Sequence, residues 1–294
     1  MIIAASLFIG GLFLPISNIY AEDLPSALKE VTEKVGEISD VSENQVLSAD
    51  EKEQKEVRIR KEALSKIFDL TLLEDKDLRN KLSGIKNLSP EQEIIREKLL
   101  GMLDENENAY SEMRSRLTDL TAVSEIKQLA IDFKDWRTAV YNPKFEKIVS
   151  FILVFQERAI LATANDRLAK IMVDIERLET AKLLKKEDTE NDISKIINTF
   201  RLAEQLNGQA EKLITETLSE ELKTSQTALV ASSKATSLTT IAASTTMETT
   251  LLEATENSEQ PSVKALIEES LGHVRSGYNL FLEMAKLIRN KIGI

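Results

Sequence analysis

Apolar residues recur every three or four positions along most of this chain, which is the spacing of amphipathic helices. The pattern is most sustained from Phe133 to Leu184, a stretch that is broken only at Tyr141-Asn142-Pro143. Because the residue before a proline avoids the helical region, we expect a helix end at Asn142 and a long central helix after Pro143. Six of the chain's fourteen aromatic residues lie in the first half of the stretch: Phe133, Trp136, Tyr141, Phe145, Phe151 and Phe155.

Two apolar stripes follow the central helix. The first runs its whole length and contains Val149, Leu153, Ile160, Ala164, Leu168, Ile171, Ile175 and Leu178. The second covers only the N-terminal half and contains Phe145, Ile148, Ile152, Phe155, Ala159 and Ala162, with Glu157 among the polar residues between the stripes. We therefore expect residues 50–222 to form a helical bundle that contains the long hairpin 143–222. The first half of the central helix is the expected hub, clasped by the helices from Ser48 to Val140, and the second half is expected to pair antiparallel with residues 190–222.

Three capping-box patterns predict helix starts before the central helix. They are Ser48 to Glu51, Thr71 to Glu74 and Ser89 to Gln92, the last with Pro90 at the first helical position. The Thr71 pattern predicts a break near Leu70 and a new short helix.

The remaining segments divide the chain further. We expect residues 22–49 to be an acidic tether with a transient or docked helix. We expect residues 223–260 to be a Ser/Thr-rich spacer, and a weakly stable continuation of the preceding helix is the alternative. Residues 261–294 predict an amphipathic helix with heptad spacing. Its candidate interaction residues are Ile267, Leu271, Val274, Tyr278, Phe281 and Ile288. The bundle, a second copy and a membrane surface all remain open as its partner.

The N-terminus resembles an export signal. The apolar run Ile2 to Leu14 is followed by a candidate cleavage site before Glu22, so we expect residues 1–21 to be a cleaved signal peptide, with an uncleaved anchor as the alternative. With either outcome we expect the protein to be exported from the cytoplasm, to the cell envelope or into the medium. We expect no other segment to be long and apolar enough to span a membrane as a helix, which takes about 20 apolar residues.

Composition narrows the fold and function classes. With only 9 Gly and 5 Pro in 294 residues, the chain favours an all-α fold: an elongated antiparallel helical bundle or coiled-coil hairpin around a long central helix, plus a tethered C-terminal amphipathic helix. A net charge of −11 argues against nucleic-acid binding and against simple docking on anionic lipid. The absence of cysteine excludes disulfides and thiolate chemistry, and His273 is the single histidine.

No catalytic, cofactor or metal constellation is recognisable. His273 lies beside no nucleophile, and one histidine is too few for the paired Glu-x-x-His motifs of a di-metal bundle. The aromatic residues Phe133, Trp136, Tyr141, Phe145, Phe151 and Phe155 are the candidate apolar pocket, although aromatics that fill a helix corner are the preferred interpretation.

Three segments carry a resemblance to other proteins. Phe133-Lys134-Asp135-Trp136-Arg137, Tyr141-Asn142-Pro143 and Phe151 to Gln156 resemble segments of uncharacterised exported helical proteins of uncultured bacteria, over about residues 50–222. The resemblance implies an exported helical protein and brings no activity with it.

We therefore expect a non-enzymatic, extracytoplasmic structural or interaction protein that presents helix surfaces to a protein or envelope partner, or to another copy of itself. The alternative is a membrane-active protein that inserts an amphipathic or hidden apolar helix, such as Ile148 to Phe155, into lipid.

Overall fold

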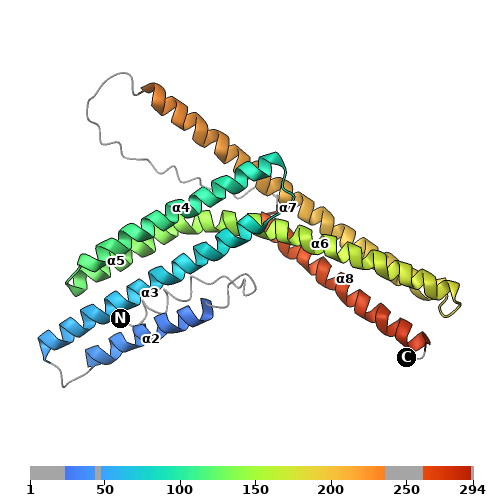
Figure 1. Ribbon diagram of the computed structural model, residues 1–294, viewed down its shortest axis with the longest axis horizontal. Coiled ribbons are helices and arrows are strands. Elements are labelled where there is room, and N and C mark those ends of the chain that lie inside the picture. Colours follow the sequence, from blue (N-terminus) through green and yellow to red (C-terminus); the bar gives the residue numbers. More distant parts are fainter. Residues whose placement is uncertain (1–23, 44–47, 236–260, 293–294) are drawn as a thin grey trace. The chain divides into compact units, whose positions relative to one another are not determined.

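The protein is all-α, as predicted. The computed structural model describes residues 24–43, 48–235 and 261–292, and its regular elements within these ranges are helices (Figure 1). They are α2 (Leu24–Glu43), α3 (Ala49–Gly84), α4 (Pro90–Asp119), α5 (Val123–Trp136), the π-helix η1 (Arg137–Tyr141), α6 (Asn142–Thr180), α7 (Lys186–Ala235) and α8 (Val263–Ile292). The chain divides into two compact units, Met1–Val149 and Ser150–Ile294, and each is described by itself. The predicted signal peptide lies outside the described residues.

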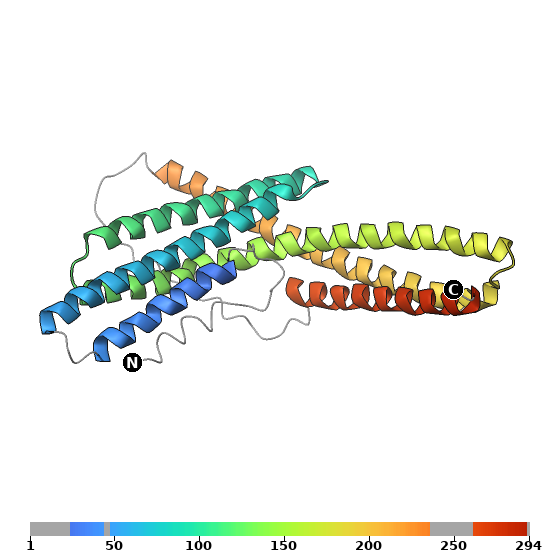
Figure 2. The ribbon, with the colours of Figure 1, turned by 60° about the horizontal axis from the view of Figure 1, so that its bottom comes forward.

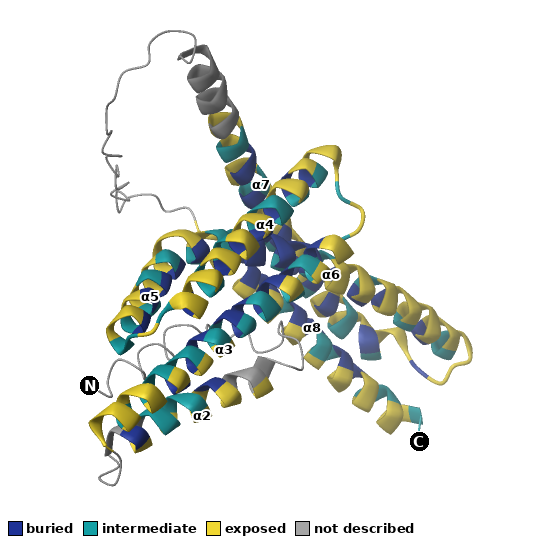
Figure 3. Ribbon diagram, turned by 60° about the vertical axis from the view of Figure 1, so that its left-hand side comes forward, coloured by how far each residue is buried: buried dark blue, intermediate teal, exposed yellow. Residues whose placement is uncertain are grey.

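The first unit is built on α3, α4 and α5, which pack around one core. Figure 3 shows buried residues along the facing sides of α3 and α4. On α3 the buried positions follow heptad spacing, and they include Leu64, Phe68, Thr71, Asp75, Leu78 and Leu82. On α4 they include Leu99, Leu103, Asn106, Tyr110 and Leu117. Both helices therefore bury polar residues at positions where a heptad expects apolar ones.

Two of the three predicted capping boxes are confirmed. The Ser48 side chain accepts a hydrogen bond from the backbone N–H of Glu51, whose carboxylate accepts one from the N–H of Ser48. Ser89 and Gln92 make the same reciprocal pair at the start of α4. Each box satisfies backbone donors that the first helical turn leaves unpaired.

The predicted break at the third box is wrong. Helix α3 continues from Ala49 to Gly84 through Thr71, whose side chain is fully buried. Its hydroxyl donates to the carbonyl of Ile67 at 2.9 Å, one turn earlier. A threonine inside a helix finds no free backbone N–H to cap, so its hydroxyl bonds back to the preceding turn.

Helix α2 packs along α3, where a tether with a transient or docked helix was expected (Figure 2). Val31 and Val41 are buried. Lys66 of α3 donates to Glu30 at 2.7 Å, and Lys34 pairs with Glu62 of α3 at 3.1 Å. The helix continues through Gly36, because packing on a neighbour outweighs the low helix propensity of one glycine.

The predicted helix end at Asn142 is also wrong, because the π-helix η1 joins α5 to α6. The N–H of Asn142 donates to the carbonyl of Arg137, five residues earlier. In an α-helix, the ring of Pro143 would clash with the carbonyl of Ala139 and remove a hydrogen bond. The wider π turn accommodates the proline without ending the helix.

The second unit contains α7, α8 and the part of α6 after Val149, and Figure 2 shows these three helices side by side. A turn joins α6 to α7, with Lys182 in the left-handed conformation at φ 57°. The N–H groups of Lys182 and Leu183 donate to the carbonyls of Glu179 and Leu178, which is the pattern of a Schellman motif. The buried core includes Ala164, Leu168, Ile175, Ile196, Phe200, Phe281 and Met284.

Two details of the predicted pattern on α6 and α7 are corrected. Ile160 was placed on the apolar stripe of α6 and is 42% exposed, whereas Glu157 was placed on a polar face and is 1% exposed. Helix α7 continues through the start of the predicted Ser/Thr-rich spacer to Ala235, and residues 236–260 lie outside the described residues.

The expectation that no segment after residue 21 is long and apolar enough to span a membrane is wrong. The continuous helix Val123–Thr180 is long and apolar enough to cross a membrane, by length and composition only, and half of its most apolar 18-residue segment is buried. The buried core helix of a soluble protein meets the same test.

Candidate interaction groove and two buried polar layers

The predicted aromatic residues divide between the two units. Phe133 and Tyr141 are buried in the first unit, with Trp136 and Phe145 partly buried against them. The ring centroid of Tyr141 lies 5.9 Å from that of Trp136 and 5.7 Å from that of Phe145. At these separations the rings pack on one another and form part of the core of the first unit.

Phe151 and Phe155 belong to the second unit. Both are buried, and their ring centroids are 4.6 Å apart. The six aromatic residues that were grouped as one candidate pocket therefore contribute to the cores of two different units.

The first unit contains a buried polar layer centred on Arg137. Its guanidinium donates to the Thr71 hydroxyl at 2.9 Å and to the Glu74 carboxylate at 3.2 Å, and it stacks 4.5 Å from the ring centre of Tyr141. The Tyr141 hydroxyl donates to the same Glu74 carboxylate at 3.3 Å. Arg137 and Glu74 are 7% and 3% exposed, so this is a buried ion pair with additional hydrogen bonds.

Asp75 is the uncompensated member of this layer. It is 5% exposed, and no hydrogen bond of normal geometry from a described residue reaches either carboxylate oxygen. Burial raises the pKa of Asp75 to about 7, although the Tyr141 hydroxyl opposes the shift. The hydroxyl of Tyr110 and the amide of Asn106 are also buried without partners among the described residues. Near neutral pH, Asp75 therefore carries a proton for a large fraction of the time.

The second unit has a smaller polar layer with one residue from each helix. The Asn207 amide of α7 donates to the Glu157 carboxylate of α6 at 3.1 Å and to the Val154 carbonyl at 3.0 Å. The Ser270 hydroxyl of α8 donates to the Ala203 carbonyl at 2.8 Å. Burial raises the pKa of Glu157, against the effect of the Ser270 and Asn207 side chains.

Helix α8 packs on α7 through a different pair of rows from the predicted one. Ile267, Val274 and Phe281 form the expected first row and are buried. The second row was expected to contain Leu271 and Tyr278, but Leu271 is 37% exposed and Tyr278 is half-buried. The buried second row is instead Ser270, Gly277 and Met284.

Gly277 explains this register. A Cβ atom at this position would lie 2.4 Å from Cε1 of Phe200, so the glycine allows the buried Phe200 ring to approach the backbone of α8. Apolar periodicity alone selects Leu271 and Tyr278, because serine and glycine are not counted as apolar core residues.

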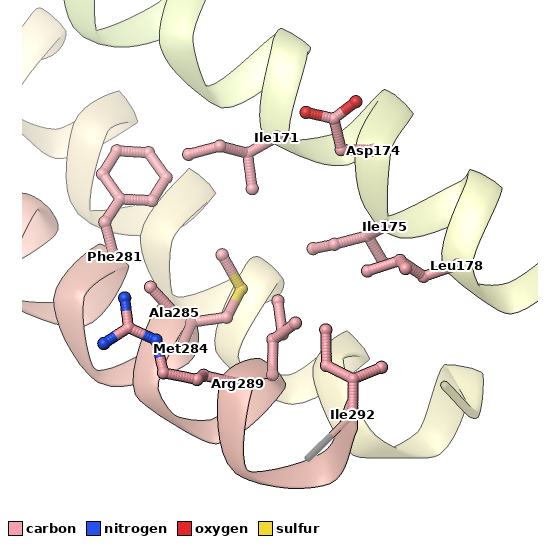
Figure 4. Close-up of a pocket in the computed structure, with 10 residues that line it drawn as sticks. Ile171, Asp174, Ile175, Leu178, Phe281, Met284, Ala285, Arg289 and Ile292 are labelled. Carbon is pink, nitrogen blue, oxygen red and sulfur yellow. The ribbon is translucent and has the colours of Figure 1, made fainter. Parts of the chain in front are cut away.

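An open apolar groove lies between α6 and α8 in the second unit. It has a volume of about 310 Å³. In Figure 4, Ile171, Ile175 and Leu178 project from α6 toward the side of α8 that carries Phe281 and Met284. Ile288 and Ile292 continue the apolar side of α8, and Asp174 and Arg289 are the charged residues of the lining.

The lining of the groove suits binding more than catalysis. Its two charged side chains are exposed, and the remainder of the lining is aliphatic apart from the Phe281 ring and the Met284 thioether. Within the described ranges, no group of three or more His, Cys, Asp or Glu side chains is arranged to hold a metal ion. The groove offers apolar surface to another apolar surface.

Sequence reasoning overlooked the polar layers and the groove. Thr71, Asp75 and Asn106 occupy heptad core positions of α3 and α4, and Arg137 lies one turn from both Phe133 and Tyr141. A polar residue that interrupts an otherwise apolar heptad was the sequence signal that could have indicated these buried polar layers. The groove had no such signal, because it depends on how far α6 and α8 are separated.

Comparison with known proteins identifies no relative: no protein-family model matches this sequence, and no curated protein and no solved structure matches it.

Proposed function

We propose that this protein is a non-enzymatic interaction protein, and that the groove between α6 and α8 is its working surface. The single observation that supports this proposal is the open apolar groove, in which the partly buried Ile171, Leu178 and Ile288 and the exposed Ala285 border the buried core residues. Such a surface is costly to leave in water, and docking of a further helix would remove it from water.

An amphipathic helix of a protein partner is the occupant that the dimensions favour. Ile171 to Leu178 spans two turns of α6, or about 10 Å, and Phe281 to Ile292 spans about 16 Å of α8. These lengths match two to three turns of a docked helix with apolar anchors at i, i+3, i+4 and i+7.

Site-specific photo-crosslinking in the cells that make the protein tests this proposal. A photoreactive residue replaces Ala285 in the groove and, as the matched control, the exposed Glu283 on another side of α8. We expect Ala285 to capture a partner through an amphipathic helix identified by mass spectrometry, and Leu178→Glu to abolish the capture. Identical products at both positions, or products that Leu178→Glu leaves unchanged, would contradict the proposal.

Export from the cytoplasm is part of the proposal and is supported by the apolar run Ile2 to Leu14. Cell fractionation and sequencing of the N-terminus of the isolated protein test it. We expect a mature chain that begins near Glu22 and lies outside the cytoplasm. An unprocessed protein recovered from the cytoplasm would contradict this part.

A membrane-active protein is the second candidate, favoured by the length and apolar composition of the helix Val123–Thr180. This candidate requires the full chain to sediment with vesicles of neutral or anionic lipid. A chain that stays in the supernatant at both lipid compositions would exclude it.

A further inference from the structure

The open flanks of the groove are basic, although the chain as a whole is acidic. On α6, Arg167, Lys170 and Arg177 share the helix side of Asp174, because they lie seven and four residues before it and three after it. On α8, Lys286 lies three residues before Arg289. All six side chains belong to exposed residues, and together they give five positive charges and one negative charge.

Asp174, the acidic residue of the groove lining, is already paired. Arg177 donates to Asp174 at 3.2 Å. Arg167 donates to the Tyr278 hydroxyl at 3.3 Å and thereby links α6 to α8 beside Phe281. Among the described residues, Lys170, Lys286 and Arg289 have no acidic partner and are available to an occupant, in a chain whose net charge is −11.

The charge of the flanks identifies the kind of occupant. A second copy that docked through its own groove would bring the same basic flanks, and like charges facing one another across an interface oppose binding. A helix with acidic flanks would place carboxylates opposite the basic side chains while its apolar stripe fills the groove. Two facing rows of helix side chains form a channel into which another helix fits by ridges-into-grooves packing.

We propose that the groove between α6 and α8 binds an amphipathic helix of another protein whose apolar stripe is flanked by Asp and Glu residues. This inference rests on the proposed function and adds the chemistry of the partner. Charge on the flanks selects the partner and accelerates its association, and the apolar lining supplies the affinity.

Two synthetic peptides test the inference on the full chain. They share one apolar stripe and are matched in length and helicity, but one carries Glu and the other Lys on both flanks. We expect fluorescence anisotropy at low ionic strength to give at least a tenfold tighter Kd for the Glu peptide, and we expect this preference to shrink at high salt.

A charge-reversal variant makes the test specific to the groove. Lys170→Glu combined with Arg289→Glu is expected to reverse the order of the two peptides. The matched control is Lys212→Glu combined with Lys264→Glu, which makes the same change in net charge at exposed positions that do not line the groove. The control is expected to keep the preference for the Glu peptide.

The outcomes separate this inference from the proposed function. If both peptides bind equally and Leu178→Glu abolishes both, the groove is the binding surface but acidic selection is wrong. If neither peptide binds, both proposals fail.

Two further outcomes would overturn the inference by identifying another occupant. In the first, the Glu peptide binds only after four glutamates of the segment before α8 are changed to Gln: Glu248, Glu253, Glu256 and Glu259. That result would mean that this segment of the same chain occupies the groove and competes with the peptide. The other is binding of anionic vesicles through the same basic residues without any peptide preference.

Discussion

The two units use heptad spacing in the same way but fill their polar core positions differently. The first unit buries a cation, Arg137, against Glu74 and adds a second carboxylate, Asp75, that has no cation of its own. Among its described residues, the second unit buries one carboxylate, Glu157, whose partner is the neutral amide of Asn207. The stability of the first unit therefore depends on an ion pair and on a proton, whereas the polar layer of the second depends mainly on hydrogen bonds.

The surfaces of the units differ in a corresponding way. The second unit leaves an apolar groove open between α6 and α8, and this groove is the surface that we propose binds a partner. The polar layer of the first unit is buried, where it favours one helix register over others, as a polar residue does in a coiled-coil seam. In the proposed function, recognition therefore belongs to the second unit, and the buried layer of the first unit contributes to its fold.

The largest expected effect comes from removing the buried cation. Arg137→Met leaves Glu74 buried without its charge partner, which should lower the free energy of unfolding by about 3–5 kcal/mol. The control Arg114→Met breaks the ion pair with Asp69, where both side chains are more than 40% exposed, and should cost about 1 kcal/mol or less. Urea unfolding followed through Trp136, the only tryptophan, reports on the first unit. Equal losses would show that Arg137 is not the centre of the layer.

The next effect is a pH dependence that belongs to the first unit. Its folded state binds the Asp75 proton with a pKa of about 7, compared with an ordinary value of 3.8. The folded state therefore holds more protons than the unfolded state between these values, so the stability that Asp75 contributes is fully present below about pH 4 and is lost as the pH rises toward 7. The charged and titratable groups around Asp75 are Glu74, Arg79, Tyr110, Arg137 and Tyr141.

Asp75→Asn tests this dependence. The variant should raise the urea midpoint at pH 8 and flatten the decline between pH 5 and pH 8, by an amount on the order of a few kcal/mol in unfolding free energy. Glu112→Gln, an exposed position on α4, is the control and should leave the profile unchanged. A profile of Asp75→Asn that is parallel to that of the original chain would refute the assignment.

A smaller effect is expected at the α7–α8 contact of the second unit. Gly277→Ala places a Cβ against the buried Phe200 ring and should destabilise this unit by about 1–3 kcal/mol. Gly272→Ala on the same helix meets open space and should stabilise it by up to about 1 kcal/mol. Thermal unfolding followed by circular dichroism distinguishes them, and a shift of the same sign in both variants would contradict the packing argument.

The smallest effect is expected in the groove itself. Leu178→Ala should cost about 1 kcal/mol or less because the side chain is only partly buried. Leu168→Ala, on the same helix but 7% exposed, should cost about 2–5 kcal/mol. Denaturant unfolding of both variants gives the comparison. If Leu178→Ala were as costly as Leu168→Ala, the groove would be part of the core and no open surface would exist there.

The sequence was sufficient to predict the fold class and the helix starts at Ser48 and Ser89, because these follow from local patterns. It was misleading at Thr71 and Pro143, where tertiary packing and a π turn override local signals. Apolar periodicity also placed Glu157 on a polar face, since a lone carboxylate in a core position looks the same as one at the surface.

The candidate sites were harder to predict than the fold. The Arg137 layer joins residues more than sixty positions apart, and nothing local to Thr71 or Glu74 indicates that partner. The groove arises from the separation of two helices, which depends on the sizes of the side chains between them. Heptad spacing predicted which side of α8 is apolar but not which neighbouring row lies against α7.

The close approach of Phe200 to Gly277 has a consequence for how this protein can vary in evolution. The two positions share one fixed volume, so a homologue with a larger residue at the glycine position needs a smaller one in place of the phenylalanine. The two positions lie 77 residues apart in the sequence, and each would look freely variable by itself. Paired substitution at these two positions would therefore mark the homologues that retain this helix register.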